Sequence, residues 1–207
     1  MLLNELNGLV RAKFDIGEDR KGALRSRFQH LQRLKFPAGV NTGRGKKVDY
    51  GWWETLQVCL AFELIDQGLS PDLVIAMISN NLDGIEFGAA VFTMLLEDSS
   101  APAELISRQK MPDGQGCFLY CAANALANFK VESEGFQGFM AFYGEDELVR
   151  DNEFRHLLDS SNGTFVNLGN IIMHILNYRA TALDEGLDAV VADFLAWASD
   201  FRPKDAS

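Results

Sequence analysis

Residues 20–50 read RKGALRSRFQHLQRLKFPAGVNTGRGKKVDY, and the arrangement of the rest of the chain follows from this basic stretch. Its first half, Arg20–Leu34, has apolar residues at helical spacing, and its second half, Val40–Tyr50, has the composition of a hairpin. An apolar helix is expected at Trp52–Gln67. The corner Gly68–Asp72 then leads into a further helix. The predicted order is therefore helix, basic hairpin, helix, helix.

Charge is distributed very unevenly along the chain. The 207 residues have a net charge of -10. Residues 20–50 nevertheless hold nine Lys or Arg and one acid, Asp49, whereas the remainder holds ten basic and 28 acidic residues. A surface field depends on local charge, so this asymmetry is typical of a basic nucleic-acid reader joined to an acidic partner domain. A solvated basic face without a binding role is the alternative.

The helix predicted at Arg20–Leu34 is expected to be ended by Pro37, whose ring disfavours helical geometry at Phe36, and it has two distinct sides. Leu24, Phe28 and Leu31 fall on one apolar stripe. The opposite side is polar and cationic. Gln can bridge N6 and N7 of adenine, and Arg can bridge O6 and N7 of guanine, so this side suits the major groove of DNA. The residues on or beside it are Arg25, Ser26, Gln29, His30, Gln32 and Arg33.

The hairpin predicted at Val40–Tyr50 carries cations at its tip. Gly43 and Gly45 permit positive φ there, and Arg44, Lys46 and Lys47 would be displayed beside them. Such a tip suits contact with phosphate or with the minor groove. The sequence fits neither the P-loop nor the dinucleotide-binding pattern, which disfavours a nucleotide cradle.

The corner after Gln67 has strong local signals. Gly68 is expected to end the preceding helix as its C′ residue. Ser70 is expected to cap the next helix with Pro71 at its first position, and Leu69 to pack against Val74.

Together these residues resemble the DNA-binding domain of the MerR family of transcription regulators, over roughly residues 5–80. The matching pieces are Ala23-Leu24-Arg25 in the recognition helix, Phe36-Pro37 at its exit, a basic wing ending in Tyr50, and the tract Gly68–Ile75. The resemblance implies a winged helix-turn-helix fold and binding to double-stranded DNA. Three departures are the longer recognition helix, Val48 where the family usually has arginine, and the lack of a long coiled-coil helix.

The second half of the chain has a different texture. Another apolar helix is expected at 82–97, followed by a linker at Asp98–Ala103. Strands are expected near Cys117–Cys121, Phe136–Tyr143 and Thr164–Leu168, with turns at Met111–Gly116 and Ser160–Gly163. Helices are expected at Glu145–Leu158, Asn170–Leu183 and Leu187–Phe201. This predicts a small acidic α/β module at 104–207 that binds an effector, dimerises or contacts the transcription machinery. Its strands bear no recognisable catalytic pattern.

Metal, cofactor and catalytic chemistry are not expected. Cys117 and Cys121 lack the spacing of a zinc site, and Cys59 belongs to a buried helix. His156, Asp159 and Ser160-Ser161 lack the surroundings of a catalytic triad. No apolar run reaches the roughly 18 residues of a membrane span, the N-terminus does not read as a signal peptide, and the odd cysteine count favours a reducing compartment, so we expect a cytoplasmic protein.

The sequence thus predicts an α+β, mostly α protein, with a winged helix-turn-helix domain and its supporting helices at 1–97 and the α/β module at 104–207. The predicted function is sequence-specific regulation of transcription, in which helix 20–35 reads the major groove and wing 40–50 contacts the backbone. A homodimer is expected, with the broad apolar faces of Ile85–Leu96 and Leu187–Phe201 available to build its interface. An adaptor that keeps the fold without binding DNA is the alternative. The predicted DNA contacts are Arg20, Lys21, Arg25, Ser26, Gln29, Arg33, Arg44, Lys46, Lys47 and Tyr50.

Overall fold

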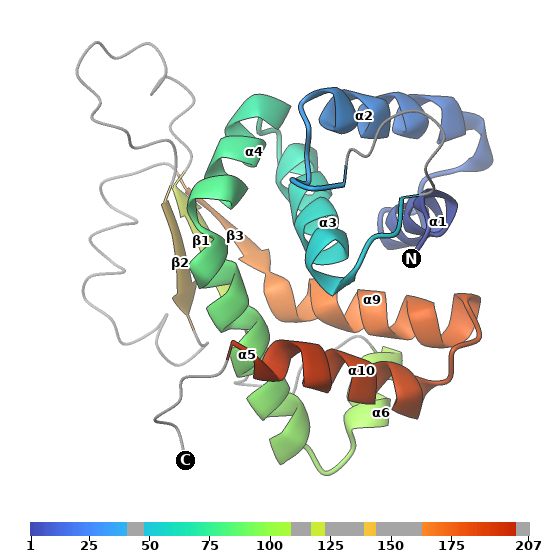
Figure 1. Ribbon diagram of the computed structural model, residues 1–207, viewed down its shortest axis with the longest axis vertical. Helices are drawn as coiled ribbons and strands as arrows, with labels where there is room; N and C mark the ends of the chain where they lie inside the picture. The colour runs from blue at the N-terminus through green and yellow to red at the C-terminus, as the bar shows by residue number, and fades with distance from the viewer. Residues whose placement is uncertain (41–47, 109–116, 123–138, 144–162, 202–207) are drawn as a thin grey trace.

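The computed structural model describes residues 1–40, 48–108, 117–122, 139–143 and 163–201 (Figure 1). Over these residues the protein is mostly helical and has one small antiparallel sheet, in agreement with the mostly α class predicted. Its elements in chain order are α1 (Leu3–Lys13), the 3-10 turn η1 (Glu18–Arg20), α2 (Lys21–Arg33), α3 (Trp52–Asp66), α4 (Pro71–Asn80), α5 (Leu82–Asp98), α6 (Pro102–Arg108), β1 (Phe118–Ala122), β2 (Phe139–Tyr143), β3 (Gly163–Asn167), α9 (Leu168–Ala182) and α10 (Leu187–Ser199).

Helix α3 is the centre of the molecule. Its sequence is apolar on nearly every side, and most of its residues are buried. Helices α1, α4 and α9 all pack against it, and α10 lies alongside α9 and α5 (Figure 1). A helix without a polar face has to be covered all round, which accounts for its central place.

The first helix packs against α9, which comes from the other end of the chain. Leu6, Leu9 and Val10 of α1 are buried. Gly8 faces the phenol of Tyr178 on α9, and a Cβ at this position would lie 2.1 Å from the phenol oxygen. Glycine at position 8 therefore allows the two helices to approach closely.

The corner between α3 and α4 is built as predicted. Gly68 has φ +95, and the amide of Leu69 donates to the carbonyl of Leu64 at 3.1 Å, which closes the end of α3. The Ser70 hydroxyl accepts from the amide of Leu73 at 3.4 Å, and Pro71 occupies the first turn of α4. Leu69 packs on the core into which Val74 is buried.

Helix α2 ends earlier than the sequence indicated, and by a different means. It stops at Arg33, and Lys35 takes the left-handed conformation with φ +60. The amide of Phe36 donates to the Leu31 carbonyl at 3.0 Å, and both side chains are buried. The helix is thus ended by this apolar capping contact rather than by the ring of Pro37, whose peptide bond is cis.

The sheet has the strand order β2-β1-β3, with both pairs antiparallel. Strands were predicted at each of these places, with bounds that differ by a few residues. The two predicted C-terminal helices are confirmed as α9 and α10. Helix α9 begins two residues before the expected Asn170, and α10 ends at Ser199 instead of Phe201. The predicted turn at Met111–Gly116, the helix at Glu145–Leu158 and the turn residues 160–162 lie outside the described residues.

A single hydrophobic core joins the two predicted modules. It includes residues of α1 to α5 together with residues of α6, β1, β3, α9 and α10. Helix α5 ends at Asp98 and α6 begins at Pro102, which leaves 99–101 between them. The domain boundary therefore stays a prediction, and any separation of the modules would expose the faces of α9 and α10 that cover α3 and α5.

The two faces expected to form a dimer interface are used inside the protein. The apolar residues of α5, among them Ile85 and Phe92, are buried, and so are Val190 and Phe194 of α10. The two helices pack against each other. These faces complete the core, so a homodimer would have to use another surface.

Candidate nucleic-acid interface

Helix α2 is held by its apolar stripe. Leu24, Phe28 and Leu31 are buried, and the ring of Phe28 lies 4.7 Å from that of Phe62 on α3. Burying each side chain stabilises the packed state by about 1.5–3 kcal/mol. Rotation of the helix about its own axis would expose these side chains and lose that free energy. Its opposite side therefore stays turned to solvent.

The predicted α2 residues all reach the surface. Arg20, Lys21, Arg25, Ser26, Gln29 and Arg33 are exposed. Three of them have local partners, and one of these is Lys21, which pairs with Glu18. Arg20 pairs with Asp19 at 3.3 Å, and the Ser26 hydroxyl donates to the carbonyl of Gly22 at 3.0 Å. The helix itself contains four Lys or Arg and no acid, so its exposed side is cationic.

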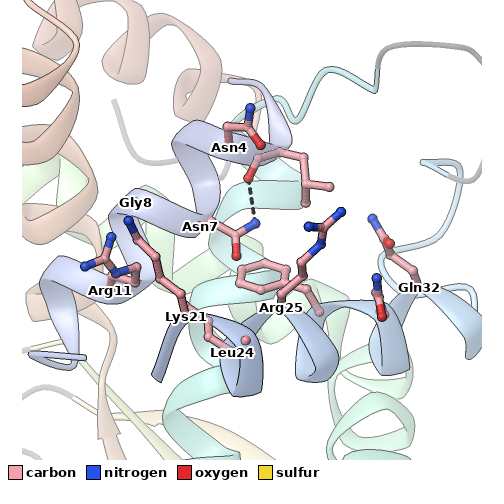
Figure 2. A pocket seen from close by; sticks show the side chains of 12 residues that line it. Asn4, Asn7, Gly8, Arg11, Lys21, Leu24, Arg25 and Gln32 are labelled. Atoms are coloured by element: carbon pink, nitrogen blue, oxygen red, sulfur yellow. Dashed lines mark hydrogen bonds between the residues drawn. The ribbon is translucent and has the colours of Figure 1, made fainter. Parts of the chain in front are cut away.

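A cleft of about 730 Å³ lies between α1 and α2, and it brings only some of the predicted residues together (Figure 2). Lys21, Arg25 and Gln29 line it from α2. Ser26 and Arg33 are not among its lining residues. Some α2 residues line the cleft and others do not, because successive turns of the helix place residues 21, 25, 29 and 32 on the side that faces α1. Apolar atoms of Leu3, Leu24 and Phe28 complete the cleft.

Three polar residues of α1 in this cleft were not predicted. Asn4, Asn7 and Arg11 face α2 across the space (Figure 2). The side-chain nitrogen Nδ2 of Asn7 donates to the Leu3 carbonyl at 2.8 Å, which fixes the orientation of the Asn7 side chain. The signal was available in the sequence, because positions 4, 7 and 11 share one face of a helix whose apolar residues lie on another.

The tip of the predicted wing carries three cations. Arg44, Lys46 and Lys47 lie outside the described residues. The segment that follows them is held beside the N-terminus, where Asp49 forms a β-bridge with Leu2 and the amide of Tyr50 donates to the Met1 carbonyl at 2.7 Å. The last residues of the predicted wing are thus tied to the start of α1.

Tyr50 has a different role from the one expected. Its side chain is only 3% exposed, and its hydroxyl accepts a hydrogen bond from Nε2 of Gln32 at 3.2 Å. A side chain this buried does not present itself to a DNA backbone. Tyr50 instead anchors the end of the predicted wing to α2.

One acidic residue pairs with two of the cations that line the cleft. Glu18 on the turn between α1 and α2 contacts Nη2 of Arg11 at 2.5 Å and also Nζ of Lys21. Hydrogen bonds from Lys21 and then from Arg11 hold the pKa of the Glu18 carboxyl below its usual range. Arg25 makes no ion pair with any residue in the described part of the chain.

Other reactive groups are buried and dispersed. Burial raises the pKa of the Cys59 thiol to about 12, and raises that of Cys117 well above its usual range. The Cys117 thiol donates to the carbonyl of Gly88 at 3.2 Å. Among the residues described, no three His, Cys, Asp or Glu side chains gather in a way that could hold a metal ion. His156 and Ser160-Ser161 lie outside those ranges.

No helix in the described ranges combines the length and the apolar character that crossing a bilayer requires. Comparison of the chain with known protein families, with curated proteins and with solved structures gives no match. The resemblance to the MerR family therefore rests on the residues quoted above.

Proposed function

We propose that the protein is a sequence-specific DNA-binding regulator of transcription, in which α2 enters the major groove and the segment 40–50 contacts the DNA backbone. The observation that carries the proposal is the seating of α2. Its apolar stripe is fixed in the core, while Arg25, Gln29 and Arg33 are held on the solvent side. A fixed helix with exposed Arg and Gln is what direct reading of base edges requires.

The dimensions of α2 suit this role. Its 13 residues correspond to a length of about 20 Å, and the major groove is about 12 Å wide. The helix lies at the edge of the molecule near α1 (Figure 1), and its residues Arg25, Gln29 and Arg33 are exposed.

The finer fold assignment is part of the same proposal. Helices α1 and α2 are joined by a short turn, and the end of the predicted wing returns to the N-terminus, where Asp49 pairs with Leu2. A helix, a turn, a second helix and a returning segment that makes one β-bridge are compatible with a winged helix-turn-helix domain, which is the fold that the MerR resemblance implies. The acidic remainder would then serve as the effector, dimerisation or partner module.

A salt series with random duplex DNA tests the proposal against the adaptor alternative. For a protein that contacts several phosphates, the logarithm of the binding constant falls linearly with the logarithm of the salt concentration. The slope is about −0.9 for each neutralised phosphate. We expect measurable binding at low salt and a steep slope. A protein with a net charge of -10 that acts as an adaptor should bind at no salt concentration. DNA that co-purifies from the native cell would then supply the site.

A further inference from the structure

Arg11 and Lys21 meet at one end of the cleft between α1 and α2 (Figure 2). They come from the two different helices, and both make an ion pair with the carboxylate of Glu18. Nε of Arg11 also donates to the carbonyl of Ile16 at 3.4 Å, which positions its guanidinium. Two cations are therefore held at a fixed place by one acid from the intervening turn.

The side chain of Glu18 is 71% exposed, whereas that of Arg11 is only 24% exposed. The acid therefore lies on the solvent side of the pair, and an incoming anion can reach the cations by displacing it. Exposed ion pairs stabilise a folded protein little and are screened by salt, so this displacement would not threaten the fold.

We propose that Arg11 and Lys21 form a phosphate-binding site and that the Glu18 carboxylate occupies it until a phosphate arrives. A carboxylate and a phosphate offer the same anionic oxygens, and a guanidinium can contact either through two nitrogens. Asn4 and Asn7 line the same cleft, two turns and one turn of α1 before Arg11. If the proposed function holds, the phosphate belongs to the DNA backbone, and this part of the inference rests on that function. The other source is a small phosphorylated ligand.

This arrangement makes Glu18 a competitor of the ligand. Binding of a phosphate has to break both of its ion pairs, so the observed affinity is lower than the two cations alone would give. Replacing Glu18 by Gln keeps the size of the side chain and removes the competing charge. The affinity for phosphate should then rise by two- to tenfold, on the order expected when two exposed ion pairs no longer compete.

The chain offers a matched control in Asp19. Its side chain is 78% exposed and pairs with Arg20, which does not line the cleft. Glu18→Gln and Asp19→Asn change the net charge by the same amount at adjacent positions. Any effect of total charge appears in both variants, whereas release of the site appears in Glu18→Gln alone.

The experiment measures binding of inorganic tripolyphosphate by calorimetry, and binding of random duplex DNA by fluorescence anisotropy, for the full chain and both variants. We expect Glu18→Gln to bind both ligands more tightly and Asp19→Asn to change little. Adding Arg11→Gln to Glu18→Gln should remove the gain. Equal gains in the two single variants, or no gain in Glu18→Gln, would overturn the site.

The two ligands separate this site from the proposed function. A gain with tripolyphosphate in a protein that binds no DNA keeps the site and refutes DNA binding, and it points to a small phosphorylated ligand. Steep salt-dependent DNA binding, with no gain for either ligand in Glu18→Gln, keeps the proposed function and refutes the site. Circular dichroism of each variant confirms that it is folded.

Discussion

Nε2 of Gln32 donates a hydrogen bond to the phenol oxygen of Tyr50 at 3.2 Å. The bond joins the last turn of α2 to the residue at which the predicted wing ends. With the bridge between Leu2 and Asp49, it fixes the return of the chain against α1 and α2. The proposed reader helix and the end of the proposed wing therefore belong to one rigid unit.

Tyr50→Phe tests this structural role. The variant keeps the buried ring and loses the hydroxyl, so we expect a loss of about 0.5–1.5 kcal/mol in the free energy of unfolding, which urea denaturation measures. DNA affinity and its salt slope should be unchanged, because the side chain is only 3% exposed. A selective loss of DNA affinity without loss of stability would return Tyr50 to the DNA contacts first predicted.

Gln29→Ala and Arg33→Ala test the reading of bases by α2. Each should weaken binding to the cognate site by on the order of 1–3 kcal/mol and change binding to random DNA little, because base contacts provide the discrimination. Arg27→Ala is the matched control, since Arg27 is an exposed cation of the same helix outside the predicted contacts. A loss as large for Arg27→Ala, or equal losses on cognate and random DNA, would contradict base reading.

Arg44, Lys46 and Lys47 test the role of the wing. Neutralising each to Gln should weaken cognate and random DNA alike and reduce the slope of log affinity against log salt by roughly one unit for each lost phosphate contact. Arg108→Gln is the control, because Arg108 is an exposed cation on α6, away from α2 in Figure 1. If the wing variants lost discrimination between cognate and random DNA while the α2 variants kept it, the wing would read the bases and α2 would contact the backbone.

His174 on α9 predicts how stability depends on pH. Burial, and then the charge of Lys13, lower its pKa from the usual 6.5, while a hydrogen bond with the Leu9 backbone acts in the opposite direction. Below pH 6.5 the unfolded chain takes up a proton that the folded His174 resists, so its contribution to stability falls as the pH drops toward the lowered pKa. Urea midpoints between pH 7 and pH 5 should decline less steeply in His174→Gln. Parallel declines would show that other groups cause the loss.

Limited proteolysis tests the predicted boundary between the two modules. We expect the first cleavage at 98–115, where α5 ends and the predicted linker begins. The two fragments should stay together in gel filtration, because α9 and α10 cover α3 and α5. Uniform resistance to cleavage would contradict the linker, and separation of the fragments would contradict the shared core.

Local interactions account for what the sequence alone could determine. The apolar stripe of Leu24, Phe28 and Leu31, the end of α3 at Gly68 and the cap of α4 at Ser70 depend on neighbours within a few residues. Spacing and backbone preference express such interactions directly. The exposed cationic side of α2 follows from the same stripe, because burying one side of a helix leaves the other in solvent.

Contacts between distant residues could be decided only by the tertiary structure. Gly8 admits Tyr178 of α9, Tyr50 turns inward to Gln32, and the apolar faces of α5 and α10 close on each other instead of remaining open. The cleft where Arg11 and Lys21 meet Glu18 depends on the angle at which α1 and α2 pack. A one-dimensional pattern shows which side of a helix is apolar. It does not show which of several apolar partners will cover that side, because many pairings bury similar area and the whole core chooses among them.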